Sequence, residues 1–228
     1  MNSDHQFDAQ FQLTRQQYLG KLDFLNWFRY FHLAKDVLSL RPEHIIEVGC
    51  GDGLLRNCLE PLVKNFCTMD INGKLQPDVV ADIRDRQAGL LASADCVIVA
   101  DVLEHIPFHD LDRAMTNILS YLRENGHALI TIPHRRSNFL FMTPTQVPHV
   151  VTVPTGFLSP GSFYRRFIKR KIWIDPDHCW EIGDGTIRNP DVDRVFQNVG
   201  FVTARFQKLL YVDYWVLKKG PELGPRGV

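Results

Sequence analysis

The sequence predicts an α/β fold in which a mostly parallel, seven-stranded sheet is flanked by helices on both faces. Short apolar runs rich in β-branched residues recur between segments of helical periodicity. Such runs are typical of strands buried on both faces, and their alternation with helices is typical of βαβ units. Two alternating segments near the end of the chain predict a C-terminal antiparallel hairpin. At 228 residues, a single domain over 1–228 is expected.

The expected strands are separated by helical or turn-forming segments. The five apolar runs are HIIEV (44–48), FCTM (66–69), VVADI (79–83), CVIVA (96–100) and ALITIP (128–133), and the hairpin strands are 203–210 and 211–219. Helices are expected over 54–65, over 111–122 with an amphipathic face, and after Asn189 as N-cap up to Gly200.

Two segments lie outside this alternation. Residues 1–40 are expected to form an N-terminal helical segment, whose apolar stripe contains Phe24, Phe28, Phe31 and Leu38. Residues 134–180 are rich in Pro, aromatic and basic residues and predict an irregular insert over the active site, with a short helix around Gly161–Arg170. A structureless segment of this length is usually functional or disordered.

The charge balance excludes a strong overall field. Lys+Arg and Asp+Glu both number 26, so nothing steers the whole chain toward nucleic acid or an acidic membrane. Between Ile130 and Ile174, however, the chain has seven basic residues and no acidic one. This stretch is either a local basic binding surface or a solvated face.

The cysteine pattern and the N-terminus predict a cytoplasmic location. Five cysteines without a CxxC motif indicate reduced thiols rather than a disulfide framework. The polar N-terminus lacks a signal-peptide pattern, and no apolar stretch reaches the ~18 residues of a membrane span.

A glycine-rich turn follows the first expected strand. Residues 47–53, here called the glycine loop, have the sequence EVGCGDG and precede a helical segment. Glycines let the backbone turn sharply against a ligand, and the start of a helix offers N–H groups and a positive dipole to an anion. A dinucleotide-binding G-x-G-x-x-G pattern fails because residue 54 is Leu. Gly51 or Gly53 could also serve the turn alone.

The spacing G-x-G-x-G, with an acid two residues before it, resembles the first motif of class I S-adenosylmethionine-dependent methyltransferases. The resemblance covers about 38–218 and implies a Rossmann-like fold with S-adenosylmethionine as cofactor. In that family the loop wraps the amino-acid part of the cofactor. The corresponding residues here are Gly49, Cys50, Gly51 and Gly53. Glu47 is a further cofactor-binding candidate, which would act directly, through water or by organising the loop.

Residues at the ends of the later strands match the same family. Asp70 would accept hydrogen bonds from both ribose hydroxyls, as an acid does in dinucleotide-binding folds, and Ile71 would flank the adenine. The third-strand acid Asp82 would meet the adenine amino group, although it could instead cap a helix. The other matching positions that would line the cofactor are Ile83, Ala100 and Asp101.

A second polar group follows the fourth expected strand. Asp101, Glu104 and His105 are spaced so that one helical turn places them on a common face, and His178 comes near the end of the insert. Two carboxylates with imidazoles suit a divalent cation such as Mg²⁺ or Mn²⁺, which would lower the pKa of a substrate hydroxyl.

The acid-x-x-Glu-His turn resembles that of ubiquinone-pathway O-methyltransferases and of small-RNA 3′-terminal 2′-O-methyltransferases. By this resemblance, the metal ligands would be Asp101, Glu104, His105 and His178. Asp101 stands where Glu is usual, which shortens the reach by one methylene. A metal-free substrate pocket and a purely structural role are the alternatives.

Three histidines are candidate catalytic bases. His134 follows the fifth expected strand and would remove a proton from an acceptor, with a structural histidine as the alternative. His105 and His178 are the other two candidates. Trp173 and Trp180 either pack over the substrate or belong to the core.

These observations predict a methyltransferase that aligns an acceptor with an activated methyl group, oxygen methylation being the preferred reaction. The acceptor would be a small molecule or, given the basic insert, a phosphate-bearing one such as RNA, a nucleotide-linked sugar or a lipid-linked glycan. Two rivals are a non-catalytic module that binds the cofactor or a partner, and a nicotinamide-dependent reductase, which the loop spacing disfavours.

Overall fold

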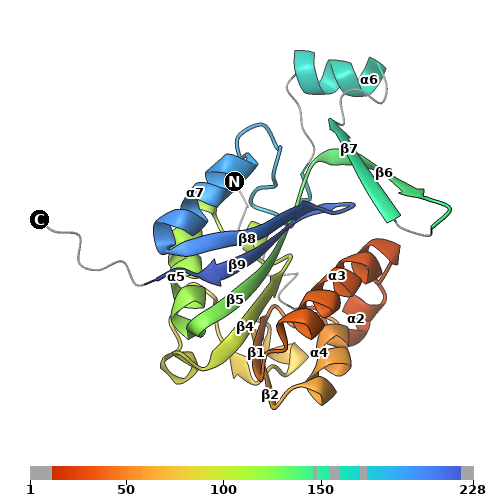
Figure 1. Cartoon of the computed structure of the whole chain (residues 1–228). Helices are drawn as coiled ribbons and strands as arrows, with labels where there is room; N and C mark the ends of the chain where they lie inside the picture. The colour runs from red at the N-terminus through yellow and green to blue at the C-terminus, as the bar shows by residue number, and fades with distance from the viewer. Residues whose placement is uncertain (1–11, 146–147, 155–159, 170–173, 222–228) are drawn as a thin grey trace, which may run out of the picture.

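A seven-stranded sheet forms the centre of the fold, as predicted (Figure 1). The computed structural model describes residues 12–145, 148–154, 160–169 and 174–221. The strand order is β3–β2–β1–β4–β5–β9–β8, and all pairs are parallel except those made by β9. The strands are β1 His44–Val48, β2 Asn65–Asp70, β3 Val79–Val80, β4 Ala94–Ala100, β5 Leu122–Pro133, β8 Phe201–Lys208 and β9 Val212–Lys219.

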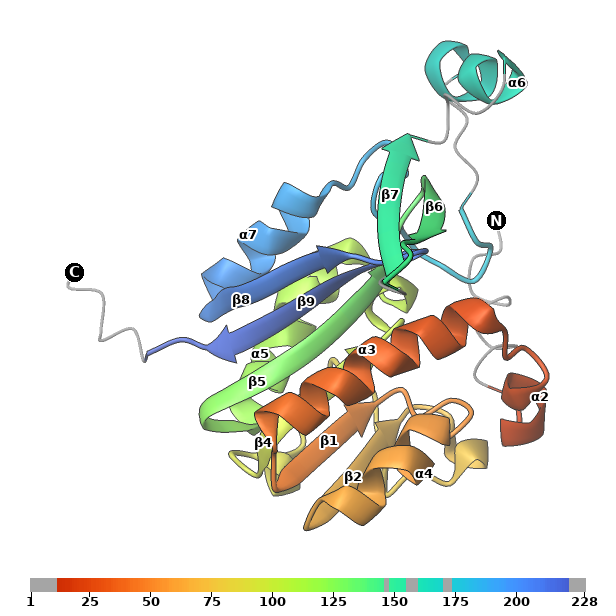
Figure 2. The same cartoon turned by 45° about the vertical axis from the view of Figure 1, so that its right-hand side comes forward.

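Helices cover both faces of this sheet (Figures 1 and 2). The α-helices are α2 Arg15–Leu19, α3 Phe24–Leu40, α4 Leu54–Leu59, α5 Leu111–Tyr121, α6 Pro160–Phe163 and α7 Asn189–Val199. Single 3₁₀ turns are η1 Glu60–Leu62, η2 Gly73–Leu75, η3 Ala88–Leu90, η4 Leu103–His105 and η5 Phe108–Asp110, and η7 Tyr164–Ile168 is a π-helical turn.

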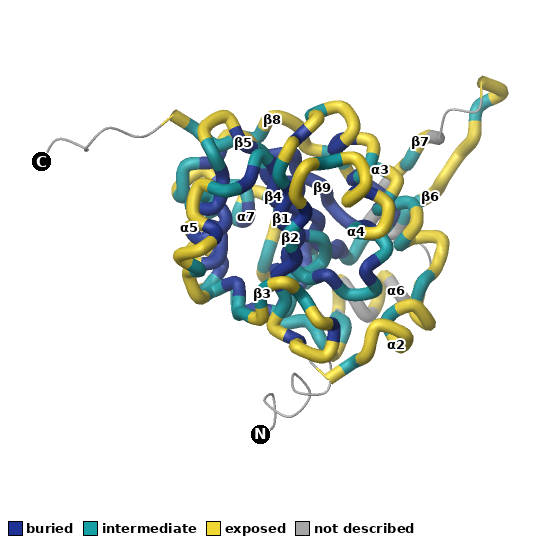
Figure 3. The backbone as a smooth tube through the Cα atoms, turned by 90° about the horizontal axis from the view of Figure 1, so that it is seen from below, coloured by how far each residue is buried: buried dark blue, intermediate teal, exposed yellow. Residues whose placement is uncertain are grey.

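Two apolar clusters fill the space between the layers. Side chains alternate along each strand, so Ile45 and Ile98 pack toward α3 and α4 while Ile46 and Val97 pack toward α5 and α7. Figure 3 shows the buried backbone concentrated in the central strands. This rigid parallel sheet places the ends of β1, β2 and β4 along one edge, where loops carry polar residues.

From residue 12 on, the helical segment expected over 1–40 consists of two helices, and its apolar stripe was assigned to the wrong face. The chain breaks after Gly20, and α3 starts at the N-cap Asp23. Phe24 and Phe31 are 62% and 57% exposed, whereas Leu33 of the same helix is fully buried. The buried face also contains two charged residues: Arg29, which pairs with Asp101, and Asp36, which pairs with Arg205. These charges hide the apolar periodicity of that face in the sequence.

In the residues that the structure describes, the insert over 134–180 contains more regular structure than predicted. It contains an antiparallel hairpin formed by β6 Arg136–Met142 and β7 Pro148–Pro154, followed by α6 and η7 close to the expected short helix. Phe residues on β6 and Val and Thr residues on β7, all with high strand propensity, account for the hairpin. The expected third strand over 79–83 is only Val79–Val80, because Asp82 accepts the backbone N–H of Arg84 and turns the chain.

Candidate cofactor and active site

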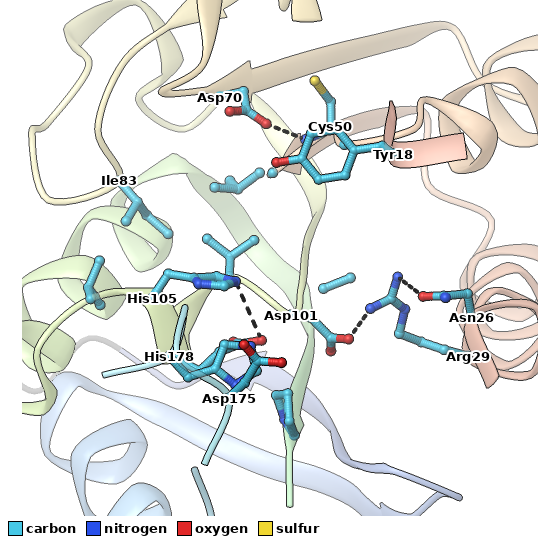
Figure 4. Close-up of a pocket in the computed structure, with 18 of the residues that line it drawn as sticks. Tyr18, Asn26, Arg29, Cys50, Asp70, Ile83, Asp101, His105, Asp175 and His178 are labelled. Atoms are coloured by element: carbon cyan, nitrogen blue, oxygen red, sulfur yellow. Dashed lines mark hydrogen bonds and ion pairs between the residues drawn. The ribbon is translucent and has the colours of Figure 1, made fainter. Parts of the chain in front are cut away.

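A cavity of about 840 Å³ opens at the carboxyl ends of β1, β2 and β4, and its other walls come from α2, α3 and the insert (Figure 4). Ligands of open α/β sheets bind at this edge. The structure brings most of the predicted site residues to the wall of this one cavity: Glu47, Gly49, Cys50, Gly51, Asp70, Ile71, Asp82, Ile83, Ala100, Asp101, Glu104, His105, His134 and His178.

The glycine loop has a backbone that only glycine adopts easily. Gly49 has a φ of 80°, and a Cβ there would lie 2.3 Å from Cγ2 of Val102. Gly53 is also left-handed, but it does not line the cavity. It begins α4, and the guanidinium of Arg15 lies 3.1 Å from its would-be Cβ. The predicted cofactor contact of Gly53 is therefore not supported; its role is to turn the chain.

Asp70 connects the glycine loop to the end of β2. Its Oδ2 accepts the backbone N–H of Cys50 at 2.9 Å, and its Oδ1 accepts that of Asn72 at 2.8 Å. A carboxylate can accept about four hydrogen bonds, so these two bonds alone do not exhaust the capacity of Asp70. Burial raises the pKa of Asp70, and the two N–H donors oppose that shift. Asp70 thus holds the loop in place and faces the cavity (Figure 4).

Glu47 is a buried acid on the cavity wall with an unpartnered oxygen. It is 5% exposed, and its Oε2 has no hydrogen-bond partner among the described residues. Burial, together with the nearby Asp52 carboxylate, raises the pKa of Glu47 to about 8. An unpaired buried carboxylate is costly, so Glu47 is suited to a cationic or hydrogen-bond-donating ligand group.

Asp82 and Ile83 lie on the cavity wall beyond Asp70. Both carboxylate oxygens of Asp82 accept hydrogen bonds from the Arg84 guanidinium, one of them at 2.6 Å. Burial opposes ionisation of Asp82, but its bonds with Arg84 lower its pKa overall. Asp82 therefore lies on the cavity wall as an ionised acid, and Arg84, which the sequence analysis did not single out, holds it there.

Sequence reasoning missed the wall contributed by the N-terminal helices. Arg29 is 7% exposed, lines the cavity and forms an ion pair with Asp101 (Figure 4). Tyr18 of α2 packs beside the glycine loop, with its Cδ1 3.8 Å from the would-be Cβ of Gly51. The only sequence feature that pointed to this wall was Arg29 itself, an arginine among the apolar residues of α3. It went unused because the apolar stripe of the helix was assigned to the opposite face.

Asp101 does not belong with the three other predicted metal ligands. Its Oδ2 accepts hydrogen bonds from Arg29 and from the hydroxyl of Tyr211 at 2.8 Å. Its Oδ1 accepts a hydrogen bond from the hydroxyl of Thr131 at 2.6 Å. The residue also has a φ of 54°, which turns the chain away at the end of β4. The prediction that Asp101 binds a metal is therefore not supported, and the acid instead anchors Arg29.

Glu104, His105 and His178 converge within the cavity. One ligand atom from each lies within 4.8 Å of the others. Glu104 is fully buried, and neither of its carboxylate oxygens has a hydrogen-bond partner among the described residues. Burial raises the pKa of Glu104 well above its usual range, and the Asp101 carboxylate adds to this shift. Such a group is suited to a cation.

The two histidines of this cluster are oriented by hydrogen bonds at Nδ1. His105 Nδ1 lies 2.8 Å from the carbonyl oxygen of Asp177, and His178 Nδ1 lies 2.7 Å from Oε1 of Glu181. Both partners are acceptors, so each Nδ1 carries the proton and each Nε2 has its lone pair available. Burial lowers the pKa of His105, which favours the neutral ring. The rings lie 4.8 Å apart (Figure 4).

His134 does not have the nitrogen that a general base needs. Its Nδ1 accepts the backbone N–H of Arg136 at 3.2 Å, and its Nε2 lies 3.2 Å from the carbonyl oxygen of Leu209. Burial and the Arg136 guanidinium lower the pKa of His134 to about 4. These contacts favour the structural alternative for His134, in which the ring fixes the path of the chain after β5; a catalytic role stays a prediction.

Trp180 does not form a substrate lid in the described structure. Trp180 is 3% exposed, donates its Nε1–H to the carbonyl oxygen of Ile106 at 2.9 Å and packs against Phe108. It is a core residue that holds the η4 turn. Trp173 lies outside the described residues.

A model of the methyltransferase domain family matches residues 24–202, which is most of the chain. The chain belongs to this family. It is an S-adenosylmethionine-dependent methyltransferase, which supports the enzyme prediction over the reductase and the non-catalytic module. No match was found among curated proteins.

Solved structures of methyltransferases share the fold of this one. The N-methyltransferase NodS from Bradyrhizobium japonicum WM9, in complex with S-adenosylhomocysteine, has a TM-score of 0.59 at 15% identity, with 96% of this chain and 100% of NodS covered. The 1,6-didemethyltoxoflavin-N1-methyltransferase of Burkholderia thailandensis has a TM-score of 0.56 at 11% identity, with 97% and 92% covered. The methyltransferase domain of bacterial CtHen1 has a TM-score of 0.56 at 12% identity, with 85% and 99% covered. At identities of 11–15%, these comparisons show a common fold and no more.

Proposed function

We propose that this methyltransferase transfers the methyl group to a hydroxyl oxygen of a small acceptor, assisted by a divalent cation. The observation that carries the proposal is the cluster of Glu104, His105 and His178, whose ligand atoms lie within 4.8 Å of one another. The cluster and Asp70 line the same cavity, so an acceptor and the cofactor would meet there. A volume of about 840 Å³ is within the range of small-molecule sites.

The residues around the glycine loop fit S-adenosylmethionine. Asp70 would accept hydrogen bonds from the ribose hydroxyls, and Ile71 and Ile83 provide apolar surface for the adenine. Glu47 offers an unpartnered oxygen to the α-ammonium group, and the nearby Arg29 offers a guanidinium to the carboxylate. The cofactor supplies a methyl group already activated as a sulfonium, so the chain contributes mainly alignment and removal of a proton.

The cluster fits a divalent cation by its donor set. Glu104 has two buried oxygens without partners, and His105 and His178 both direct their Nδ1 protons to fixed acceptors. Metal-binding histidines are typically held in this way. With Asp101 committed elsewhere, two nitrogens and one carboxylate remain, which favours Mn²⁺ over Mg²⁺. A cation here would lower the pKa of an acceptor hydroxyl.

The charge around the cavity favours a neutral acceptor over the phosphate-bearing one. Arg135 pairs with Glu181, and Arg136 pairs with Asp213, so both arginines after β5 are neutralised within the protein. The other basic residues of the insert follow the hairpin, at 165–171. A small hydroxyl compound needs none of these charges.

A second candidate mechanism uses the same residues without a metal. Glu181 is fully buried and accepts the Nδ1 proton of His178 at 2.7 Å. Burial opposes ionisation of Glu181, but its bonds to His178, Asp175 and Arg135 lower its pKa. A carboxylate that orients a histidine and stabilises its cation makes Nε2 a competent general base. The structure therefore supports a His178 base as the alternative.

Metal binding can be measured without knowing the acceptor. The free Mn²⁺ signal in electron paramagnetic resonance should fall on addition of the protein, with about one ion bound per chain, and His105→Asn and His178→Asn should each weaken binding by about 10-fold or more. His109→Asn is the matched control, because His109 is 82% exposed and outside the cluster. No Mn²⁺ binding by the unaltered protein would contradict the metal proposal.

Turnover separates the two mechanisms. With hydroxyl-bearing acceptors screened by release of S-adenosylhomocysteine, a chelator should abolish activity, and Mn²⁺ should restore it better than Mg²⁺. Full activity in chelator, together with loss of activity in His178→Asn, would favour the metal-free base.

A further inference from the structure

The insert projects from the body of the molecule while both its ends are fixed at the cavity. Figures 1 and 2 show β6, β7 and α6 extending beyond the sheet. Arg135 lines the cavity directly before β6, and Asp175 and His178 line it near the other end of the insert. A partner that binds the insert therefore lies close to the cavity.

The β6–β7 hairpin is apolar on both faces. Side chains alternate along a strand, so Phe139 and Phe141 share one face, where their rings stack at 6.4 Å, while Leu140 and Met142 share the other. Phe141 is 54% exposed and Met142 63% exposed. A two-stranded hairpin is at best marginally stable alone in water, and an exposed apolar patch of this kind marks an interaction site.

The helical part of the insert combines apolar and basic residues. Ile168 is 63% exposed, and Lys169 is exposed with its Nζ 5.5 Å from the centre of the Tyr164 ring. The sequence of 165–171 is RRFIKRK, and the chain has no acidic residue between Ile130 and Ile174. Aromatic and aliphatic side chains next to basic ones are typical of segments that lie in the interface of an anionic membrane.

We propose that the insert docks this methyltransferase on the surface of an anionic lipid bilayer. Stacking of nucleic-acid bases would use the aromatic rings, but it gives no role to exposed aliphatic side chains such as Met142 and Ile168. A symmetric contact with a second copy would bring the same patch, with the exposed Lys169 of each chain, into one interface and so gather like charges there. A bilayer with acidic headgroups satisfies both the apolar and the basic residues.

Docking would bring the cavity to the membrane. Figures 1 and 3 place α3 on the same side of the molecule as the hairpin and α6. The outer face of α3 adds exposed Phe24 and Trp27, while Leu25 and Asn26 of the same helix line the cavity. No helix in the described part of the chain is long and apolar enough to cross a bilayer, so contact is with the surface. The docking proposal does not depend on which atom is methylated.

Co-sedimentation of the full chain with vesicles tests this inference. The protein should pellet with phosphatidylcholine vesicles that contain phosphatidylglycerol, not with phosphatidylcholine alone, and raised salt should release it. Phe141→Ser and Met142→Ser should each weaken binding by about 10- to 100-fold, the value of burying such a side chain. Lys169→Glu should weaken it by about 10-fold.

Matched controls lie elsewhere on the surface. Leu62→Ser and Val80→Ser alter side chains 59% and 62% exposed, and Lys218→Glu reverses an exposed charge, so all three should bind like the unaltered protein. All altered positions are exposed, so unfolding midpoints should not change. Salt-insensitive binding, equal binding to neutral vesicles or no binding by the unaltered chain would overturn the inference. A dimer that Phe141→Ser dissociates, or RNA binding that Lys169→Glu removes without any vesicle binding, would also overturn it.

Discussion

Substitution of the buried acid Glu47 by Gln should stabilise the protein while weakening the cofactor site. Burial raises the pKa of Glu47 from 4.5 to about 8. The folded chain therefore keeps a proton that the unfolded chain has released, so stability is full below pH 4.5 and is lost as the pH rises through 8. The shift of 8 − 4.5, about 3.5 units at ~1.36 kcal/mol each, corresponds to about 5 kcal/mol. Glu47→Gln keeps the shape and removes this loss.

Urea unfolding of the cofactor-free protein at about pH 5 and about pH 9 measures the effect. The free energy of unfolding should fall with pH by several kcal/mol more in the unaltered protein than in Glu47→Gln. Glu43→Gln is the matched control, because Glu43 is exposed and bound to Lys64. Glu47→Gln should also bind S-adenosylmethionine more weakly, by ~10-fold, since the α-ammonium group, which favours release of the Glu47 proton, loses the carboxylate that would receive it. The same pH dependence in Glu47→Gln and the unaltered protein would refute the assignment of a buried, protonated acid.

Three further substitutions test the local geometry. Gly49→Ala should lower the free energy of unfolding in urea by about 2 to 5 kcal/mol, because of the φ of 80° and the 2.3 Å approach of the new Cβ to Val102. Val102→Ala in the same chain should recover part of this loss, and purely additive costs would contradict the clash. His134→Asn should flatten the pH dependence of the free energy of unfolding. Because the pKa of His134 is lowered from 6.5 to about 4, the unaltered protein should lose about 3 kcal/mol as the pH falls from 6.5 to 4. The same pH dependence in His134→Asn would count against a buried neutral ring. Arg29→Met should cost about 3 kcal/mol because it leaves the partly buried Asp101 without its cationic partner, and Asp101→Asn in the same chain should restore part of the unfolding free energy. A neutral Arg29→Met would contradict the ion pair.

The parallel sheet and the glycine loop could be predicted because they rest on local patterns. Buried parallel strands have continuous apolar sequences, and the turn after β1 needs glycine at Gly49 for a reason visible in one segment. Acids at strand ends, such as Asp70, meet at one edge because parallel strands point the same way. Order along the chain was enough to place them together.

The errors concern residues whose partners lie far away in the sequence. Arg29 and Asp36 lie on the buried face of α3 only because Asp101 and Arg205 neutralise them. Asp101 was assigned to a metal because nothing in its own segment reveals Arg29 or Tyr211. Likewise, His134 was assigned as a base because Leu209, whose carbonyl oxygen contacts its Nε2, is 75 residues away in the sequence.

Calorimetric titration of S-adenosylhomocysteine into the unaltered chain and into Asp70→Asn is the most direct test of how this enzyme holds its cofactor. The unaltered protein should bind one equivalent, and Asp70→Asn, which loses the charge that receives the ribose hydroxyls, should bind at least ~10-fold more weakly. Asp78→Asn, at an exposed acid bound to Arg56 and outside the cavity, should leave the affinity unchanged. Equal affinities for the unaltered protein and Asp70→Asn, or no heat of binding in either, would contradict the assignment.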